Sequence, residues 1–490
     1  MGEPINAFPG YSFERLEDGK FHNMYRGVDL GKGGWVYSDP GIYSNVALLD
    51  VASLHPSSII ALNKLGKYTQ RYADLKQARV YIKHKDFESA AKLFDGKLGK
   101  YLSDAKSAKA LSKALKLPIN AFFGISFATF DNPARDSRDK NNIIALRGAL
   151  FMKTLFDEVE SRGFHVVHNK TDSEKIPNAT LEIIKFVQDF ATKYDYEMEH
   201  EATYERMCLI DKANYIAAYM SPEKCIELYG YAPEENVEYF KEHGHPWTAT
   251  GTEFQRPYIF KTLFSGEPIE FSDLCETKTV KNAAIYLDMN EGLPDVTLFE
   301  KELSKRLWNA EHSDDKKKLN PDYISMSDDE VRAEIAKGHN YQFVGRAGSF
   351  IPVKAGVGGG VMLAYRNGKY DSVIGTKDYR WLESEKVKTL GMQDDYDRRY
   401  YQAMVDEAIA AINKFGDFEA FIDISKPYDW KPRYNDPPGC EGIEDDELPF
   451  DLVPCGDGKY NTCLECPNYA DTICRRGYSL ASYVETGGGA

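Results

Sequence analysis

The stretch LLDVASLHPSSII (residues 48–60) decides the fold, because an apolar run ends in an acid and a turn follows. Residues 46–49 predict a buried strand with Asp50 at its end. The backbone amides of residues 52–55 then offer donors for a phosphate, as amides at turns and helix N-termini do. Capping of the following helix is the ordinary alternative role for such an Asp. Asp50 therefore needs a partner before it indicates chemistry.

A second acid stands in a similar frame. VVHNKTDSEKI (residues 166–176) predicts a strand, a tight turn and another strand, with Asp172 at the tip. A solvated turn acid is the ordinary alternative. Two acids on adjacent strands can bind two divalent cations, which activate an attacking hydroxyl and stabilise a leaving phosphate. The pair of acids is thus the first functional hypothesis.

A basic helical segment lies between the two acids. Residues 61–120 carry 14 Lys or Arg against 5 Asp or Glu, and KLPINAFFG (residues 116–124) ends this segment. Lys109, Lys113 and Lys116 share one helical face, which suits a phosphate ligand. A merely solvated lysine-rich surface is the ordinary alternative.

Length and charge set the outer limits. The 490 residues allow two or three domains, and no apolar run approaches the length of a membrane span. The N-terminus shows no secretion signal, so we expect a cytoplasmic protein. The net charge of −15 argues against nucleic acid as a partner, but it averages over the basic segment and acidic regions such as residues 441–451.

The pattern of elements predicts an α+β fold. Residues 1–35 resemble a loop and 36–60 read as strands. We expect helices at 67–95, 103–117, 141–162, 181–194 and 398–415, a strand pair at 205–219, and short strands within 337–373.

Taken in order, three stretches resemble the motifs of family B DNA polymerases. Asp50–Ser57 is similar to motif A, Lys116–Gly124 to motif B, and His168–Ser173 to motif C. Lys32–Trp35 resembles the Gly-Gly linker before the palm, and Lys212–Tyr215 resembles the Lys-x-Tyr motif that holds the primer. The resemblance covers about residues 30–220 and looks most like a phage-type member.

The resemblance implies a right-hand architecture. It places an N-terminal segment and linker at 1–35, the palm at 36–66 and 121–235, and a short two-helix fingers hairpin at 67–120. The thumb and C-terminal region would span 236–430, and a Cys-rich tail 431–490.

The resemblance also implies roles for matching residues. Asp50, Asp172 and Lys116 would be catalytic, and two Mg²⁺ ions would be bound by Asp50, the Val51 carbonyl and Asp172. The nucleotide would be bound by Ser53, Leu54, His55, Arg79, Lys83, Lys116, Asn120 and Phe123. DNA would be contacted by Gly33, Gly34, Gly124, Thr171, Lys212 and Tyr215.

Four departures separate the chain from the family pattern. Lys170 replaces the first Asp of motif C, and His55 replaces the Tyr that excludes a ribose 2′-OH. Ala121 and Phe123 replace a Ser and a Tyr of motif B. Only 49 residues precede Asp50, so we expect the exonuclease domain on a separate polypeptide or absent.

Five cysteines crowd the end of the chain. Cys440 precedes a set with the spacing of a metal knuckle: Cys455, Cys463, Cys466 and Cys474. Four thiolates suit a structural zinc ion, an iron–sulfur cluster is an alternative, and free thiols are the ordinary case. Such a module would be structural and would suit docking of a partner.

The sequence favours a DNA-templated DNA polymerase that adds dNTPs to a primer 3′-OH. Its partners would be primer–template DNA, dNTP and a separate exonuclease or replisome subunit, without a membrane, in the cytoplasm of the host bacterium if a phage encodes it. The alternative is a non-catalytic DNA-binding replisome subunit in which Lys170 marks a degenerate site. A polymerase that tolerates ribonucleotides is a second alternative, because of His55.

Overall fold

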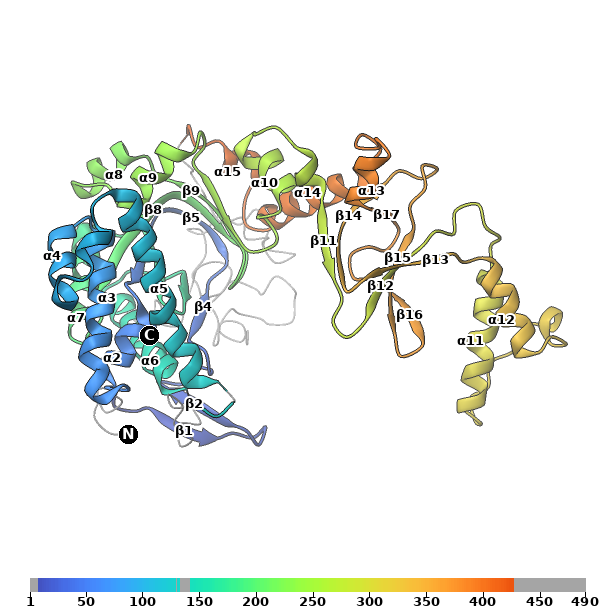
Figure 1. Ribbon diagram of the computed structural model, residues 1–490, viewed down its shortest axis with the longest axis horizontal. Coiled ribbons are helices and arrows are strands. Elements are labelled where there is room, and N and C mark those ends of the chain that lie inside the picture. Colours follow the sequence, from blue (N-terminus) through green and yellow to red (C-terminus); the bar gives the residue numbers. More distant parts are fainter. Residues whose placement is uncertain (1–7, 129, 133–141, 427–490) are drawn as a thin grey trace, which may run out of the picture. The chain divides into compact units, whose positions relative to one another are not determined.

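A computed structural model describes residues 8–128, 130–132 and 142–426 (Figure 1). The chain divides into two compact units. The first comprises described residues up to Glu253 and from Ala411 onward, and the second is Phe254–Ala410. Each is a mixture of helices and antiparallel strands, so the α+β prediction is confirmed at this level. No helix in the described ranges is both long and apolar enough to cross a membrane.

A seven-stranded antiparallel sheet organises the first unit, in the order β10-β9-β8-β5-β7-β6-β4. Its strands are β4 (Val36–Ser38), β5 (Gly41–Val51), β6 (His168–Lys170), β7 (Ser173–Pro177), β8 (Met198–Leu209), β9 (Tyr215–Tyr219) and β10 (Trp247–Thr250). The long strand β5 pairs with β7 on one side and β8 on the other. Its nearly continuous apolar run follows from this central position, because both of its faces are covered.

Helices α6 (Ile143–Glu160) and α7 (Leu181–Thr192) form one core with β5 and β7. Leu49 and Ile176 on the sheet and Leu150 and Val187 on the helices are fully buried there. The other face carries a second cluster that includes Leu48 and the tyrosines 204, 215 and 219. Since side chains alternate along a strand, Asp50 lies on the same face as Leu48.

Four helices pack beside the sheet around their own core, and Figure 1 shows α3 and α5 side by side. They are α2 (Leu54–Ala61), α3 (Thr69–Lys83), α4 (Phe87–Lys92) and α5 (Ala105–Phe127). The predicted helix 67–95 is wrong as one element, because Lys85 has a φ of 61° and Asp86 caps α4 by accepting from Ser89 N. The predicted end at residue 117 is also wrong.

Helix α5 continues past Pro118 to Phe127. A proline removes one helical hydrogen bond, but packing outweighs this loss. Ile119 is buried in the helical core, and the buried Tyr72 hydroxyl of α3 donates to the Ile119 carbonyl (2.7 Å). The stretch resembling motif B is therefore helical throughout.

The first 35 residues contain more order than the loop that we predicted. A three-stranded sheet is formed by β1 (Ser12–Arg15), β2 (Phe21–Tyr25) and β3 (Val28–Asp29). The turn between β2 and β3 places Arg26 and Gly27 at φ values of 48° and 79°, the conformation of a tight hairpin. Strands of two to five residues are too short to give a clear alternation in the sequence.

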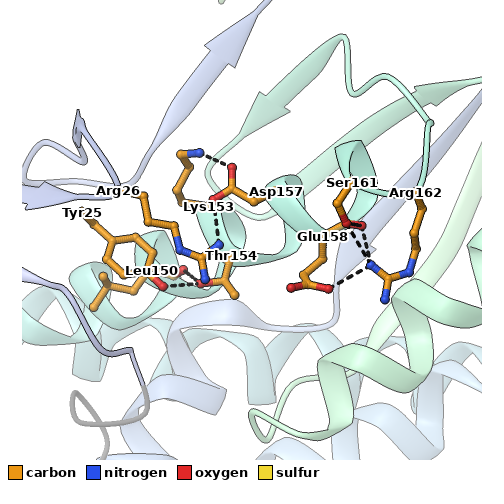
Figure 2. Close-up of polar contacts among 9 residues, drawn as sticks. All are labelled: Tyr25, Arg26, Leu150, Lys153, Thr154, Asp157, Glu158, Ser161 and Arg162. Atoms are coloured by element: carbon orange, nitrogen blue, oxygen red, sulfur yellow. Dashed lines mark hydrogen bonds and ion pairs between the residues drawn. The ribbon is translucent and has the colours of Figure 1, made fainter. Parts of the chain in front are cut away.

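This small sheet is joined to α6 by polar contacts (Figure 2). The Tyr25 hydroxyl bonds to Thr154 Oγ1 (3.0 Å), and Arg26 donates to Asp157 (2.8 Å). Lys153, whose side chain is 10% exposed, forms an ion pair with the same Asp157. Asp157 thus neutralises one buried cation and one exposed cation.

The first unit also contains α-helices that follow strand β9 or the second unit in the chain. They are α8 (Pro222–Tyr229), α9 (Glu234–Glu242) and α15 (Phe418–Ile422). β10 pairs with β9, and the buried Arg206 on β8 donates to the carbonyls of Ala420, Phe421 and Asp423. Residues 236–253 and 411–426 therefore belong to the first unit, and the second unit is shorter than the expected region 236–430.

The second unit contains two sheets. One has the order β11-β14-β17 and the other β13-β12-β15-β16. The strands are β11 (Glu276–Thr279), β12 (Ala284–Asp288), β13 (Tyr341–Gly345), β14 (Ala347–Val353), β15 (Val361–Arg366), β16 (Lys369–Ser372) and β17 (Arg380–Glu383). The helices are α10 (Pro257–Phe260), α11 (Thr297–Glu311), α12 (Asp328–Lys337), α13 (Ser384–Thr389) and α14 (Arg398–Asn413), which ends beyond the unit. The predicted short strands within 337–373 are confirmed.

Asp157→Ala should lower the free energy of unfolding by about 2 kcal/mol, because it leaves Lys153 buried without its carboxylate. Arg26→Ala should cost less than about 1 kcal/mol, since the Arg26 side chain is 41% exposed. Chemical denaturation measures both. Glu158→Ala, which breaks the exposed pair with Arg162, is the control; equal losses for Asp157→Ala and this control would contradict the argument.

Candidate functional site

The pairing of β5 with β7 brings the two predicted acids together. Asp50 lies opposite Ser173, the residue that follows Asp172. Val51 N also donates to the Asp172 carbonyl (2.8 Å). Asp50 and Asp172 therefore stand at neighbouring positions where the two strands meet the β6–β7 turn.

The conformation of this turn is fixed by the chain around Gly34. Thr171 has a φ of 61°, and its N–H donates to the Trp35 carbonyl (3.2 Å), which also accepts from Asn169 Nδ2 (3.0 Å). A Cβ on Gly34 would lie 3.0 Å from Thr171 Cγ2. Gly34 thus permits a close backbone approach that holds Asp172 in place, whereas a Cβ on Gly33 would meet open space.

Strand β8 adds two acids that sequence reasoning missed. Glu199 lies directly opposite Asp50. The register shifts between Leu48 and Leu49, so Glu201 is an extra residue on β8 beside the site. Such bulges occur preferentially near functional sites. The alternation of acids in YEMEHE (residues 196–201) was the available signal.

Burial and mutual repulsion dominate the electrostatics of these carboxylates. Burial raises the pKa of Asp50 to about 8, with further contributions from Asp172, Glu201 and Glu199. Burial also raises the pKa of Asp172, which Lys175 and Lys170 partly oppose. A divalent cation would relieve this repulsion, and paired carboxylates are the ligands that hard cations prefer. The acids therefore fit a magnesium site chemically.

The described residues contain no preassembled cluster of three His, Cys, Asp or Glu side chains around a metal position. The donor set that fits a cation is the carboxylate pair with the predicted backbone ligand Val51, the last residue of β5. Lys170 occupies the end of β6, where the family pattern has a third acid.

The chain after Asp50 makes a sharp turn into α2. Ser53 holds the N-cap position of this helix with a φ of 66°, and its side chain accepts no capping hydrogen bond. Asp50 lies three residues before that position, so it is not the N-cap residue of α2. Ala52 N donates to the Glu197 carbonyl (2.8 Å), which removes it from the predicted phosphate donors. Leu54 is buried, and a Cβ on Gly148 of α6 would lie 2.8 Å from its Cδ2. The Leu54 side chain thus anchors α2 to the core.

One ring contact joins the stretches that resemble motifs A and B. His55 stacks on Phe123 of α5, with ring centroids 4.0 Å apart and planes 13° from parallel. Burial lowers the pKa of His55, and its buried Nδ1 has no hydrogen-bond partner among the described residues. The two rings therefore lie face to face, and each covers one face of the other.

Basic side chains of α3 reach the same region. Lys83 forms an ion pair with Glu199, and Arg79 donates to Ser53 Oγ (3.5 Å). Lys76, which sequence reasoning missed, donates to Ser57 Oγ (2.8 Å). Helix α3 thereby places cations beside the acids. On α5, by contrast, the side chains of Lys109, Lys113, Lys116 and Asn120 are exposed, and Gly124 has open space around its Cα.

The stretch resembling the primer-holding motif contacts the β6–β7 hairpin. Lys212 is exposed, but Tyr215 is buried in β9. The buried Lys175 contacts His168 Nδ1 (3.2 Å) and lies over the Tyr215 ring, and His168 Nε2 contacts the Lys212 carbonyl (3.3 Å). Burial lowers the pKa of His168 to about 3, which makes it neutral. These contacts tie the hairpin to the Lys212 loop.

The predicted cysteine site lies outside the described residues. Cys440, Cys455, Cys463, Cys466 and Cys474 lie beyond residue 426, so zinc or iron–sulfur binding stays a prediction.

Comparison with known proteins gives a partial sequence match. Over 160 residues, which cover 29% of this chain, the chain is 31% identical to DNA polymerase II of Escherichia coli (strain K12). Over this segment the chain is similar to a DNA polymerase. The match covers 19% of that enzyme, so the chain corresponds to about a fifth of its length. No protein-family model matches the chain.

A solved structure was also matched. The family B DNA polymerase of the hyperthermophilic archaeon Pyrobaculum calidifontis aligns with 80% of this chain and 48% of its own, with a TM-score of 0.34 and 13% identity.

The raised pKa of Asp50 predicts that the stability of the fold depends on pH when a chelator removes divalent cations. Between the ordinary pKa of 3.8 and about 8, the folded chain holds a proton that the unfolded chain releases. Rising pH therefore disfavours folding. From about pH 5 to about pH 9, wild type should lose at least about 1 kcal/mol of unfolding free energy relative to Asp50→Asn.

Denaturant titrations at several pH values measure this difference. Asp189→Asn, which alters an exposed acid on α7, should follow the wild-type pH profile. Parallel profiles for wild type and Asp50→Asn would show that Asp50 ionises normally in the folded chain.

Proposed function

We propose that this chain is a DNA-templated DNA polymerase that joins dNTPs to a primer 3′-OH with release of pyrophosphate. The observation that carries the proposal is the adjacency of Asp50 and Asp172, produced by the pairing of β5 with β7. The partial similarity to DNA polymerase II supports it. The ordered resemblance to motifs A, B and C supports the assignment to family B.

Asp50, the Val51 carbonyl and Asp172 would hold two Mg²⁺ ions. Bound there, the ions would activate the primer hydroxyl and neutralise charge on the phosphates. The high pKa of Asp50 supports this assignment, because carboxylates that repel each other gain most from a cation. Glu199 and Glu201 would add negative potential without being ligands.

The remaining side chains would position the nucleotide. Arg79, Lys83 and Lys116 would neutralise the triphosphate, with Lys83 leaving Glu199 to do so. Ser53 would contact the phosphates. The stacked His55 and Phe123 would form the wall against which the sugar and nascent base pair lie, with Asn120 beside them. A flat wall would restrict a ribose 2′-OH, so selection for dNTP is part of the proposal.

DNA would be held by exposed groups around the hairpin. Lys212 would contact the primer strand, and the buried Tyr215 would support the loop that carries it. Gly33, Gly34, Gly124 and Thr171 would allow the DNA backbone to approach. In this proposal the first unit contains palm and fingers, and the second unit is a thumb. A cytoplasmic location and a phage origin complete it.

The alternative is a DNA-binding replisome subunit without activity. One observation favours it: Lys170 brings a cation near Asp172, where the family pattern has an acid, and opposes the rise in the pKa of Asp172. A cation at this position weakens Mg²⁺ affinity through repulsion. Mg²⁺-dependent primer extension on a defined template distinguishes the two functions.

Asp172→Asn should reduce primer extension by at least about a thousandfold, because a metal ligand is lost while the shape of the turn is kept. Affinity for primer–template DNA should change by less than about twofold. Extension gels and fluorescence anisotropy give the two readouts, with Asp189→Asn as the control. Substantial extension by Asp172→Asn would rule out the proposed site.

Lys116→Ala should raise the KM for dNTP about tenfold or more with a smaller change in kcat, because it removes a charge that binds the triphosphate. Lys185→Ala is the control, since Lys185 is an exposed lysine on α7, away from the basic face of α5. Steady-state extension at varied dNTP provides the constants. Identical KM values for the two variants would remove Lys116 from the nucleotide site.

A further inference from the structure

One face of the four-stranded sheet in the second unit is covered by aromatic rings. Tyr286 of β12 contacts Phe343 of β13 and Tyr365 of β15, with centroids 5.4 and 5.9 Å away. Tyr341 and Tyr370 stack at 4.0 Å. The opposite face of the same strands is buried core, because Ile285, Leu287 and Met362 are inaccessible. We call these five rings the aromatic face.

Two of these rings are open to solvent. Phe343 is 67% exposed and Tyr365 is 39% exposed, whereas the three other rings are half-buried among themselves. An exposed phenylalanine beside an exposed tyrosine gains little from packing in the isolated chain. Clustered exposed aromatic rings mark interaction surfaces more often than scattered ones do.

Four basic residues gather at one end of this sheet. In the antiparallel order β13-β12-β15-β16, the end of β13, the start of β12, the end of β15 and the start of β16 coincide. Arg346 follows β13 and Lys281 precedes β12, whereas Arg366 is the last residue of β15 and Lys369 is the first residue of β16. Backbone contacts agree, since Val280 N donates to the Arg346 carbonyl (3.0 Å) and Arg366 donates to the Lys281 carbonyl (3.0 Å).

Positive charge predominates at this end of the sheet. All four basic residues are exposed, and none forms an ion pair with another described residue. The stretches 277–287, 341–353 and 361–370 contain no Asp or Glu. The acids of this sheet are Asp371 of β16, which is exposed and pairs with Ala364, and Asp288, which stands at the opposite end and is buried against His339. Near the exposed aromatic rings, four exposed basic residues therefore stand against one exposed acid of the sheet, Asp371.

We propose that the aromatic face binds single-stranded DNA, with bases stacked on Phe343 and Tyr365 and phosphates on the basic end. Stacking accepts any base, and lysines and arginines follow the backbone. A duplex fits less well, because its base faces are already covered by neighbouring bases. The choice of DNA over RNA rests on the proposed function, in which a template strand is present.

Photocrosslinking locates the contact on the full chain. An oligothymidylate of about 20 nucleotides that carries 5-iodouracil should form adducts with the peptides containing Phe343 or Tyr365. The reaction contains neither dNTP nor Mg²⁺, so a chain without polymerase activity still gives an interpretable result. Adducts confined to other peptides would overturn the proposal.

Variants separate stacking from charge. The double variant Phe343→Ala with Tyr365→Ala should raise the Kd for the oligothymidylate about tenfold or more. The salt dependence of binding should stay unchanged. Tyr365→Phe keeps the ring and should bind as wild type. Arg346→Ala with Lys369→Ala should make the slope of log K against log salt shallower by about 1.4. Leu298→Ala, an apolar α11 side chain that is 59% exposed, is the matched control.

Three outcomes of these binding measurements would also overturn the proposal. They are wild-type affinity in the Phe343 and Tyr365 double variant, an equal loss for the Leu298 control, and an equal loss of affinity for a blunt duplex. Primer extension on a template with a short overhang should stay at the wild-type rate in the double variant. Absence of extension by the wild-type chain, with oligonucleotide binding retained, would contradict the proposed polymerase function alone.

Discussion

The hydrogen bond from Val51 N to the Asp172 carbonyl is the constraint on which the site depends. It closes the ladder between β5 and β7, and so brings together two acids that are 122 positions apart in the chain. Everything else around them supports this juxtaposition. Gly34 and Trp35 fix the turn that carries Asp172, Leu54 anchors the chain that leaves Asp50, and α3 supplies compensating cations. The proposed chemistry needs no strained catalytic side chain, only two carboxylates that repel each other until a cation binds.

Much of the site was predictable because its signals are local. An apolar run that ends in an acid predicts a strand, and lysines at intervals of three and four residues predict one helical face. The positions of Asp50 and Asp172 beside paired strands and the exposed face of lysines on α5 were predicted in this way. Glu199 and Glu201 were missed, since their position depends on the register of β8 against β5 and on a bulge. Register is a property of two strands, so neither strand alone encodes it.

Errors in the predicted elements have equally physical causes. The helix expected over 67–95 breaks at Lys85, whose left-handed backbone has no strong signal in a lysine. Helix α5 runs through Pro118 because the packing of Ile119 and Tyr72 compensates for a lost hydrogen bond. The N-terminal sheet was missed because its short strands are stabilised by contacts to α6 through Tyr25 and Arg26. In the last two cases a tertiary contact outweighed local preference.

The anchoring of residues 418–426 by Arg206 has a topological consequence. The chain leaves the first unit after Glu253 and returns to it at Ala411, so the second unit is an insertion with both ends held by the same body. The guanidinium of Arg206 fastens the returning end to β8 through the carbonyls around α15. A single backbone cleavage within the insertion would thus leave two fragments that stay associated through the first unit.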